Sequence, residues 1–113
     1  MKQTEYTSIT RATKLKVAQR DSVDGWPCCI GCGAPAPHDG ALSFSCAHYV
    51  PRSRGGAGRE ENIGTLCWEC HTTLDRKLKG WREIDAKFRK RLEDSYPGWD
   101  PKMMKYRKGC MDE

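Results

Sequence analysis

The chain has 113 residues, of which 37% are hydrophobic and 31% are charged, with seven cysteines and a formal net charge of +5. This length allows one domain at most, and so small an apolar core commonly needs a disulfide or a metal to hold it together. No stretch is apolar enough to span a bilayer and no signal-peptide pattern begins the chain, so we expect a cytoplasmic protein without a membrane partner. In a reducing compartment an odd number of cysteines favours metal binding over disulfides.

The N-terminal part of the chain is expected to hold a short tail and one helix. Residues 1–7 show no periodic pattern and are interpreted as a flexible tail. Over residues 8–21 the apolar side chains recur near the period of a helix. Ser8 or Thr10 would cap its first turn, because either side chain can accept a hydrogen bond from a free backbone N–H.

A cysteine-rich segment and a strand are expected next. Residues 23–40 are dense in Gly, Pro and Cys, which indicates a knuckle held by metal rather than regular structure. Residues 41–50 alternate between apolar and polar, which predicts a strand with Cys46 and His48 on one face. We expect that face to meet the core. Pro51 ends the strand, because it has no backbone N–H to donate to a neighbouring strand.

A loop, a second strand and a helix follow. The loop over residues 52–62 is charged and rich in glycine, and the apolar run at 63–66 predicts a short strand. A helix is expected from about 67 to 79, where Gly80 interrupts it.

An amphipathic helix is predicted over residues 81–96, because Ile84, Phe88 and Leu92 lie four apart on one face. Residues 97–113 begin with Pro-Gly and are interpreted as a basic C-terminal tail. Lys and Arg are frequent towards both ends of the chain, which favours a polyanionic partner. A solvated helix face would have the same composition, so charge alone does not decide between these interpretations.

Four of the seven cysteines form two CxxC pairs, at residues 29–32 and 67–70. Two sulfurs three residues apart in a tight turn can point at one ion, and two such knuckles complete a tetrahedral thiolate shell that suits zinc. Cys28 lacks the spacing for this shell, and Cys46 is expected to be a small buried side chain. The predicted ligands of a structural zinc ion are therefore Cys29, Cys32, Cys67 and Cys70.

The stretch CAHYVPRSRGGAGREENIGTLCWECHTTLD, from Cys46 to Asp75, resembles the HNH endonucleases of the ββα-metal superfamily, particularly small phage and prophage members. The upstream CIGCG resembles the first knuckle of that family. The resemblance implies an α+β fold with a small zinc-stapled ββα-metal core at about residues 41–79. We expect this core to lie within a nuclease domain over residues 8–96, with helices flanking it.

The resemblance implies a role for each of three motif residues. His48 would be the general base that deprotonates the attacking water, for which an unperturbed imidazole pKa near 6.5 is suitable. His71 would bind a catalytic divalent ion (Mg²⁺, Mn²⁺, Ni²⁺ or Zn²⁺) that stabilises the pentavalent phosphorus and the leaving 3′ oxygen. Asn62 would bridge backbone groups of the preceding loop and so orient His48, although a plain turn residue is the alternative.

The sequence departs from the family pattern at one metal ligand. Many members carry Asp or His immediately before the general base, whereas this chain has Ala47, which cannot bind a metal. Asp75 is the candidate substitute, since it lies four residues after His71 and would share a helix face with it. The alternative for Asp75 is a surface ion pair with Lys79.

The leading hypothesis is a metal-dependent endonuclease that acts on double-stranded DNA and leaves 5′-phosphate and 3′-hydroxyl ends. Arg52 and Arg54 flank the turn after the strand and are expected to bind DNA phosphates, because guanidinium groups pair bidentately with phosphate oxygens. The resemblance suggests phage or prophage DNA processing and a packaging protein such as terminase as a partner. One active site per chain favours a monomer that nicks DNA.

Two other classes of function remain open. One is a zinc-knuckle DNA-binding module without catalysis, which Ala47 favours; the other is a zinc-stabilised adaptor for a packaging protein. A module that only binds has no need of His48, Asn62 and His71 together, so this triplet favours the nuclease. His38, in the proline-rich segment, is interpreted as a structural residue.

Overall fold

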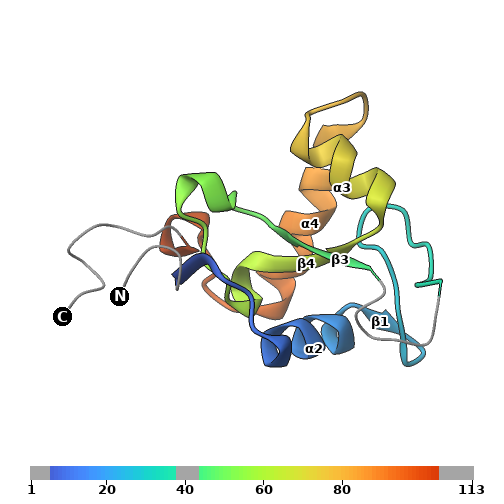
Figure 1. Cartoon of the computed structure of the whole chain (residues 1–113), viewed down its shortest axis with the longest axis horizontal. Coiled ribbons are helices and arrows are strands. Elements are labelled where there is room, and N and C mark those ends of the chain that lie inside the picture. The colour runs from blue at the N-terminus through green and yellow to red at the C-terminus, as the bar shows by residue number, and fades with distance from the viewer. Residues whose placement is uncertain (1–5, 38–43, 105–113) are drawn as a thin grey trace.

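The computed structural model describes residues 6–37 and 44–104, which form a central β-hairpin covered by helices (Figure 1). Over these residues no helix is both long and apolar enough to cross a membrane. Its helices and strands are, in chain order, α2 (Arg11–Arg20), β1 (Ser22–Val23), β2 (Trp26–Pro27), β3 (Ser45–His48), β4 (Ile63–Leu66), α3 (Trp68–Asp75) and α4 (Trp81–Ser95).

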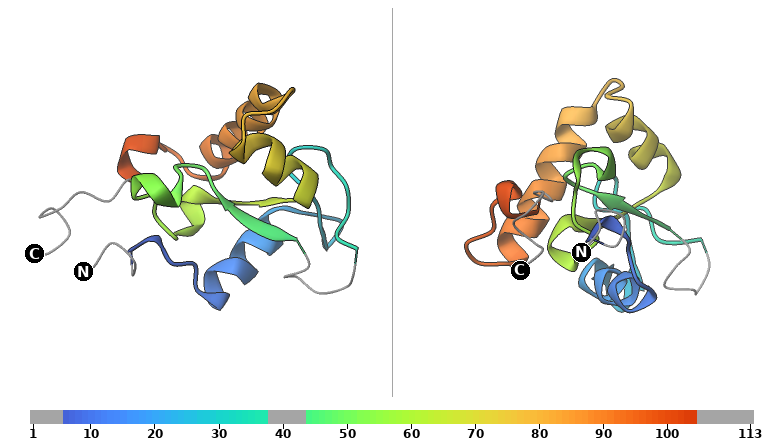
Figure 2. Two further views of the ribbon diagram at one scale, coloured as in Figure 1. Left: turned by 45° about the horizontal axis from the view of Figure 1, so that its top comes forward. Right: turned by 60° about the vertical axis from the view of Figure 1, so that its left-hand side comes forward.

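Strands β3 and β4 pair antiparallel along their whole length and lead directly into α3, which gives a ββα unit. Helix α2 lies on one side of this hairpin and helices α3 and α4 lie on the other (Figure 2). The expected α+β fold, a ββα core with flanking helices, is confirmed. The strand predicted over residues 41–50 is observed at 45–48, and residues 41–43 lie outside the described part of the chain.

The core-facing residue of β3 is Ala47, so the expectation that Cys46 and His48 would face the core is wrong. Ala47 is 2% exposed, whereas Cys46 and His48 are half-buried. Ala47 pairs with Gly64 across the hairpin, and a Cβ added to Gly64 would lie 2.5 Å from Cε1 of Phe88. Helix α4 therefore packs closely against this face, and only small residues fit beneath its phenylalanine.

The connection between α3 and α4 is longer than the sequence predicted. Helix α3 ends at Asp75 rather than near residue 79, because Lys77 adopts a left-handed conformation with φ of 52°. Helix α4 has the expected extent and buries Phe88 and Leu92 completely. Spacing of four residues places both side chains on the face that meets the hairpin, as predicted.

Helix α2 is fixed at both ends by polar contacts. Thr10, not Ser8, caps its start: the Thr10 hydroxyl oxygen accepts a hydrogen bond from the Thr13 N–H at 3.1 Å. At the other end the Asp21 carboxylate is 1% exposed and accepts hydrogen bonds from Arg20 at 2.8 and 2.9 Å. It also accepts from Arg91 of α4 at 2.8 Å and from the backbone N–H of Thr65 in β4 at 2.9 Å. One buried carboxylate thus joins α2, β4 and α4.

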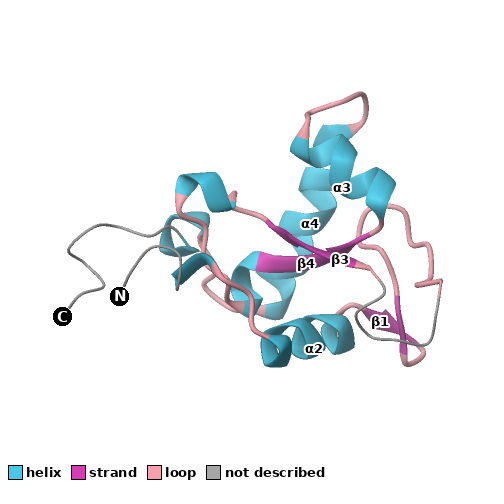
Figure 3. Cartoon of the chain, viewed as in Figure 1, coloured by secondary structure: helices cyan, strands magenta, loops and turns pink. Residues whose placement is uncertain are grey.

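Strands β1 and β2 form a hairpin where the sequence analysis expected no regular structure. Its two-residue turn is Asp24-Gly25, with φ of 53° and 81°, which are the positive values that this class of tight turn requires. An Asp-Gly pair is the usual sequence signal of such a turn, but two-residue strands are too short to show an alternating pattern. The rest of the segment that carries the first knuckle is mainly loop (Figure 3).

The described parts of both expected tails pack against the glycine-rich loop. Tyr6 and Thr7 are buried, and the carbonyl oxygen of Tyr6 accepts a hydrogen bond from the Gly58 N–H at 2.9 Å. At the other end Met104 is 3% exposed, and its carbonyl oxygen accepts from the Ala57 N–H at 2.7 Å. A Cβ added to Gly58 would lie 1.9 Å from the Ser8 carbonyl oxygen, so this glycine is what lets the N-terminal segment approach.

Candidate active site and metal centre

The four cysteines of the two CxxC pairs come together at the start of α3. Their sulfur atoms all lie within 4.8 Å of one another, and the sulfurs of Cys32 and Cys67 are 3.7 Å apart. Tetrahedral coordination with Zn–S distances of about 2.3 Å places sulfurs about 3.8 Å apart. The cluster therefore has the donors and the spacing to hold a zinc ion.

The local electrostatics also favour a cation among these sulfurs. Burial alone would raise the pKa of Cys29, but hydrogen bonds from the backbone N–H groups of Cys67 and Cys32 bring that pKa below its ordinary value. Burial and the neighbouring thiols raise the pKa of Cys67 and of Cys70. Four thiolates this close repel one another, and a divalent cation removes that repulsion.

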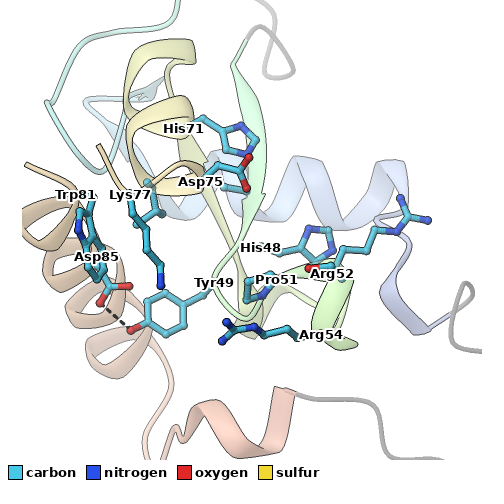
Figure 4. A pocket seen from close by; sticks show the side chains of 13 residues that line it. His48, Tyr49, Pro51, Arg52, Arg54, His71, Asp75, Lys77, Trp81 and Asp85 are labelled. Carbon is cyan, nitrogen blue, oxygen red and sulfur yellow. Dashed lines mark hydrogen bonds between the residues drawn. The ribbon is translucent and has the colours of Figure 1, made fainter. Parts of the chain in front are cut away.

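A cleft of about 600 Å³ lies beside the ββα unit (Figure 4). The end of β3 contributes His48, α3 contributes His71 and Asp75, and α4 contributes Asp85. Imidazole and carboxylate groups thus line one open cavity. Such an arrangement is expected where a metal ion and a proton acceptor act together on one bond of a substrate.

His48 is half-buried at the last position of β3, and its Nε2 lies 2.8 Å from the carbonyl oxygen of Thr7. A carbonyl oxygen can only accept a hydrogen bond, so Nε2 carries the proton and the lone pair is on Nδ1. Burial lowers the pKa of His48 below 6.5, and the positive charge of Arg52 lowers it further, against the raising effect of the Thr7 contact. At neutral pH the ring is uncharged and its Nδ1 can take up a proton.

The imidazole of His71 is oriented by the first residue of β3. Its Nδ1 lies 2.9 Å from the hydroxyl oxygen of Ser45, which itself donates to the Leu66 carbonyl oxygen at 3.0 Å. Because the Ser45 hydroxyl has a single proton and donates it to Leu66, the oxygen accepts from Nδ1–H of His71. The lone pair of His71 is therefore on Nε2, the atom available to an ion.

Asn62 is completely buried and ties together the loop that follows His48. Its amide oxygen accepts from the Val50 N–H at 2.8 Å, and its amide nitrogen donates to the carbonyl oxygens of Val50 and Ala57 at 3.2 and 2.8 Å. Its own carbonyl oxygen accepts from the Tyr49 N–H at 2.8 Å. The side chain thus bridges backbone groups of the loop, as its position in the motif suggested.

Residues 29–77 match the family model of the HNH endonucleases. This part of the chain is therefore similar to an HNH endonuclease domain. The match includes the four cysteines, the buried Asn62 and the cleft residues His48, His71 and Asp75, whereas α2 and α4 lie outside it. No curated protein matches the chain.

The side chains of His71 and Asp75 project from α3 into the same part of the cleft (Figure 4). In the described chain the four cysteines are the only group of three or more His, Cys, Asp or Glu side chains close enough to share one ion. Ala47 is buried against α4 and offers no donor. The described cleft thus offers imidazole and carboxylate donors to a cation, but no group of three or more that converge on one point.

The two arginines of the HNH motif extend in opposite directions (Figure 4). Both belong to the exposed 3-10 turn Arg52–Arg54. The Nε of Arg52 donates to the hydroxyl of Thr7 at 3.3 Å, which turns its guanidinium towards the N-terminal segment. Both were expected to bind DNA phosphates, and their guanidinium groups face different directions (Figure 4).

Sequence reasoning missed the residues that orient the two histidines of the cleft. Thr7 lies in what was interpreted as a tail, and Ser45 meets His71 only through the strand register. It also missed the contact between Tyr49 and Asp85, in which the tyrosine hydroxyl donates at 3.1 Å. Burial and the Asp85 carboxylate raise the pKa of Tyr49 to about 12, so this hydroxyl stays protonated.

Proposed function

We propose that this chain is a metal-dependent endonuclease that hydrolyses phosphodiester bonds of double-stranded DNA. The single observation that carries the proposal is the pairing of His48 and His71 in one cleft, each imidazole held by a partner on one nitrogen only. His48, with its lone pair on Nδ1, supplies a proton acceptor. His71, with its lone pair on Nε2, supplies a metal ligand. The match of residues 29–77 to the HNH endonucleases supports this assignment.

In the proposed reaction His48 Nδ1 takes a proton from a water molecule as the water oxygen attacks phosphorus. The bond between phosphorus and the 3′ oxygen then breaks, and the leaving oxygen takes a proton from solvent water, which leaves a 5′-phosphate and a 3′-hydroxyl. The contact between Nε2 and Thr7 holds the ring as it becomes charged, and Asn62 keeps the following loop in place. A divalent ion bound by His71 and Asp75 would supply stabilisation of the negative charge on phosphate and leaving group.

The proposal includes a structural zinc ion held by Cys29, Cys32, Cys67 and Cys70, and the sulfur spacing supports it. For the catalytic ion Mg²⁺, Mn²⁺, Ni²⁺ and Zn²⁺ are the candidates. A shell of one imidazole and one carboxylate leaves several positions for water and for substrate phosphate, as Mg²⁺ and Mn²⁺ prefer.

We also propose a biological setting for this chemistry. The resemblance of the motif to small phage and prophage nucleases supports a role in phage DNA processing in the host cytoplasm, with terminase as a candidate partner. A single cleft on one chain supports a monomer that nicks one strand at a time. Exposed Arg52 and Arg54 support binding through phosphates rather than through bases.

The nuclease is tested by incubating supercoiled plasmid with the wild-type protein and with His48→Ala, in the presence of each candidate ion or of a chelator. We expect metal-dependent nicking that falls by about 10²–10⁴-fold in His48→Ala, because a positioned general base contributes that much. His38→Ala is the matched control, since it removes an imidazole to which no catalytic role is assigned. Zinc content and circular dichroism establish that each variant is folded.

Equal nicking by wild type and by a folded His48→Ala variant would remove His48 from the mechanism. If no candidate ion supports cleavage while DNA binding persists, the protein is instead a zinc-knuckle DNA-binding module without catalysis, and Ala47 becomes the reason. Tight binding to a packaging protein, without DNA affinity at moderate salt, would identify the adaptor.

A further inference from the structure

Helix α2 and strand β3 enclose a second pocket of about 510 Å³. Its walls include Lys14 from α2 and Cys46 from β3. His48 and Arg52 line this pocket and the main cleft alike, so the two cavities adjoin at the proposed general base. Lys14, Ile9, Phe44 and Cys46 of its lining have no part in the proposed reaction, whereas Ser45 orients His71.

The two pockets differ in charge. The second pocket has the cations Lys14 and Arg52 and no Asp or Glu among its described lining residues. The main cleft, by contrast, combines the carboxylates of Asp75 and Asp85 with the cations Arg52, Arg54 and Lys77. The second pocket, lined by cations without carboxylates, suits an anion.

Both cations are directed towards this pocket. Lys14 lines this pocket together with Cys46. The bond from Arg52 Nε to the Thr7 hydroxyl turns the guanidinium away from Arg54 (Figure 4). No described carboxylate forms an ion pair with Lys14 or Arg52.

We propose that the second pocket binds a backbone phosphate of the DNA strand next to the phosphate that is cleaved at His48, with Lys14 and Arg52 as its cations. The proposal rests on the proposed nuclease function and adds a substrate subsite to it. Successive phosphates of one strand follow at about 3.4 Å of helix rise, so a strand that crosses His48 presents phosphates to both cavities. Arg54 and Arg52 then serve different phosphates, which explains why their side chains diverge.

The subsite is tested by measuring the affinity for a short DNA duplex over a range of salt concentrations, without added divalent cation. In Lys14→Gln we expect weaker binding and a plot of log Kobs against log salt that is shallower by about 0.9, the contribution of one phosphate contact. Lys14→Arg should keep the wild-type slope. Lys16→Gln is the matched control on the same helix, because Lys16 is 68% exposed and lies 3.8 Å from Glu60 rather than in the pocket.

A wild-type slope in Lys14→Gln, or the same change of slope in Lys16→Gln, would overturn the subsite. A wild-type protein that does not bind the duplex would overturn it as well. If plasmid is cleaved normally while the slope does not depend on Lys14, the subsite alone is wrong. If the slope depends on Lys14 but no ion supports cleavage, the subsite stands and the nuclease proposal is wrong.

Discussion

The contact between Ser45 and His71 shows how one hydroxyl decides which nitrogen of an imidazole keeps a free lone pair. An imidazole that is free to rotate can present either nitrogen, and ordering it costs conformational entropy when the ion binds. The Ser45 oxygen holds Nδ1–H at 2.9 Å, and its own proton is used by Leu66. The His71 ring is therefore ordered when the chain folds, so metal binding does not have to reduce its conformational entropy further.

We predict that Ser45→Ala weakens binding of Mn²⁺ in the cleft by about 10–100-fold, the usual effect of losing a partner of a metal ligand. The measurement is isothermal titration of the zinc-loaded protein with Mn²⁺. Ser45→Thr should retain most of the affinity because it keeps the hydroxyl. Ser53→Ala is the control, since Ser53 lines the same cleft without contacting His71. Identical affinities in wild type and Ser45→Ala would show that Ser45 does not orient the ligand.

At the scale of single elements, local patterns predicted what depends on local geometry. The four-residue spacing in residues 81–96 predicted α4, because helical periodicity is a property of the segment alone. The strand face was assigned wrongly, since alternation cannot tell which face a later helix will cover, and α4 covers the face of Ala47. The Asp21 network was also beyond local reasoning, because its partners are 44 and 70 residues away in sequence.

That network predicts an effect on stability that an exposed ion pair would not have. Asp21→Asn leaves the buried guanidinium of Arg20 without its counter-charge, so we expect a loss of about 3–5 kcal/mol in the free energy of unfolding. Urea denaturation of the zinc-loaded protein measures it. Asp94→Asn is the matched control, because its pair with Lys90 is exposed and is expected to contribute about 0–1 kcal/mol. Losses of similar size in both variants would contradict the role of Asp21 as a link between elements.

At the scale of the whole molecule, the cleft is assembled from parts that the motif does not contain. The spacing of the cysteines predicted which four sulfurs would meet, because two knuckles can share one ion only in that combination. The same reasoning could not predict Thr7 as the partner of His48, which depends on the N-terminal segment docking at Gly58. A motif specifies the groups that react, whereas the flanking segments specify how those groups are held.

The cysteine cluster joins the loop of the first knuckle to α3, so zinc should be required for the folded state of the whole domain. Structural zinc contributes about 10–16 kcal/mol in small metal-stabilised domains, which equals or exceeds the usual 5–15 kcal/mol of net stability. We therefore predict that Cys32→Ser binds no zinc and loses cooperative thermal unfolding, as does the wild type after chelation. Cys28→Ser is the matched control: Cys28 adjoins the first knuckle but lies outside the four-sulfur group, so this variant should keep one zinc per chain. Normal zinc content in Cys32→Ser, together with loss of zinc in Cys28→Ser, would show that the wrong cysteines were assigned as ligands. Cooperative unfolding after complete chelation would show that the apolar core is stable without the ion.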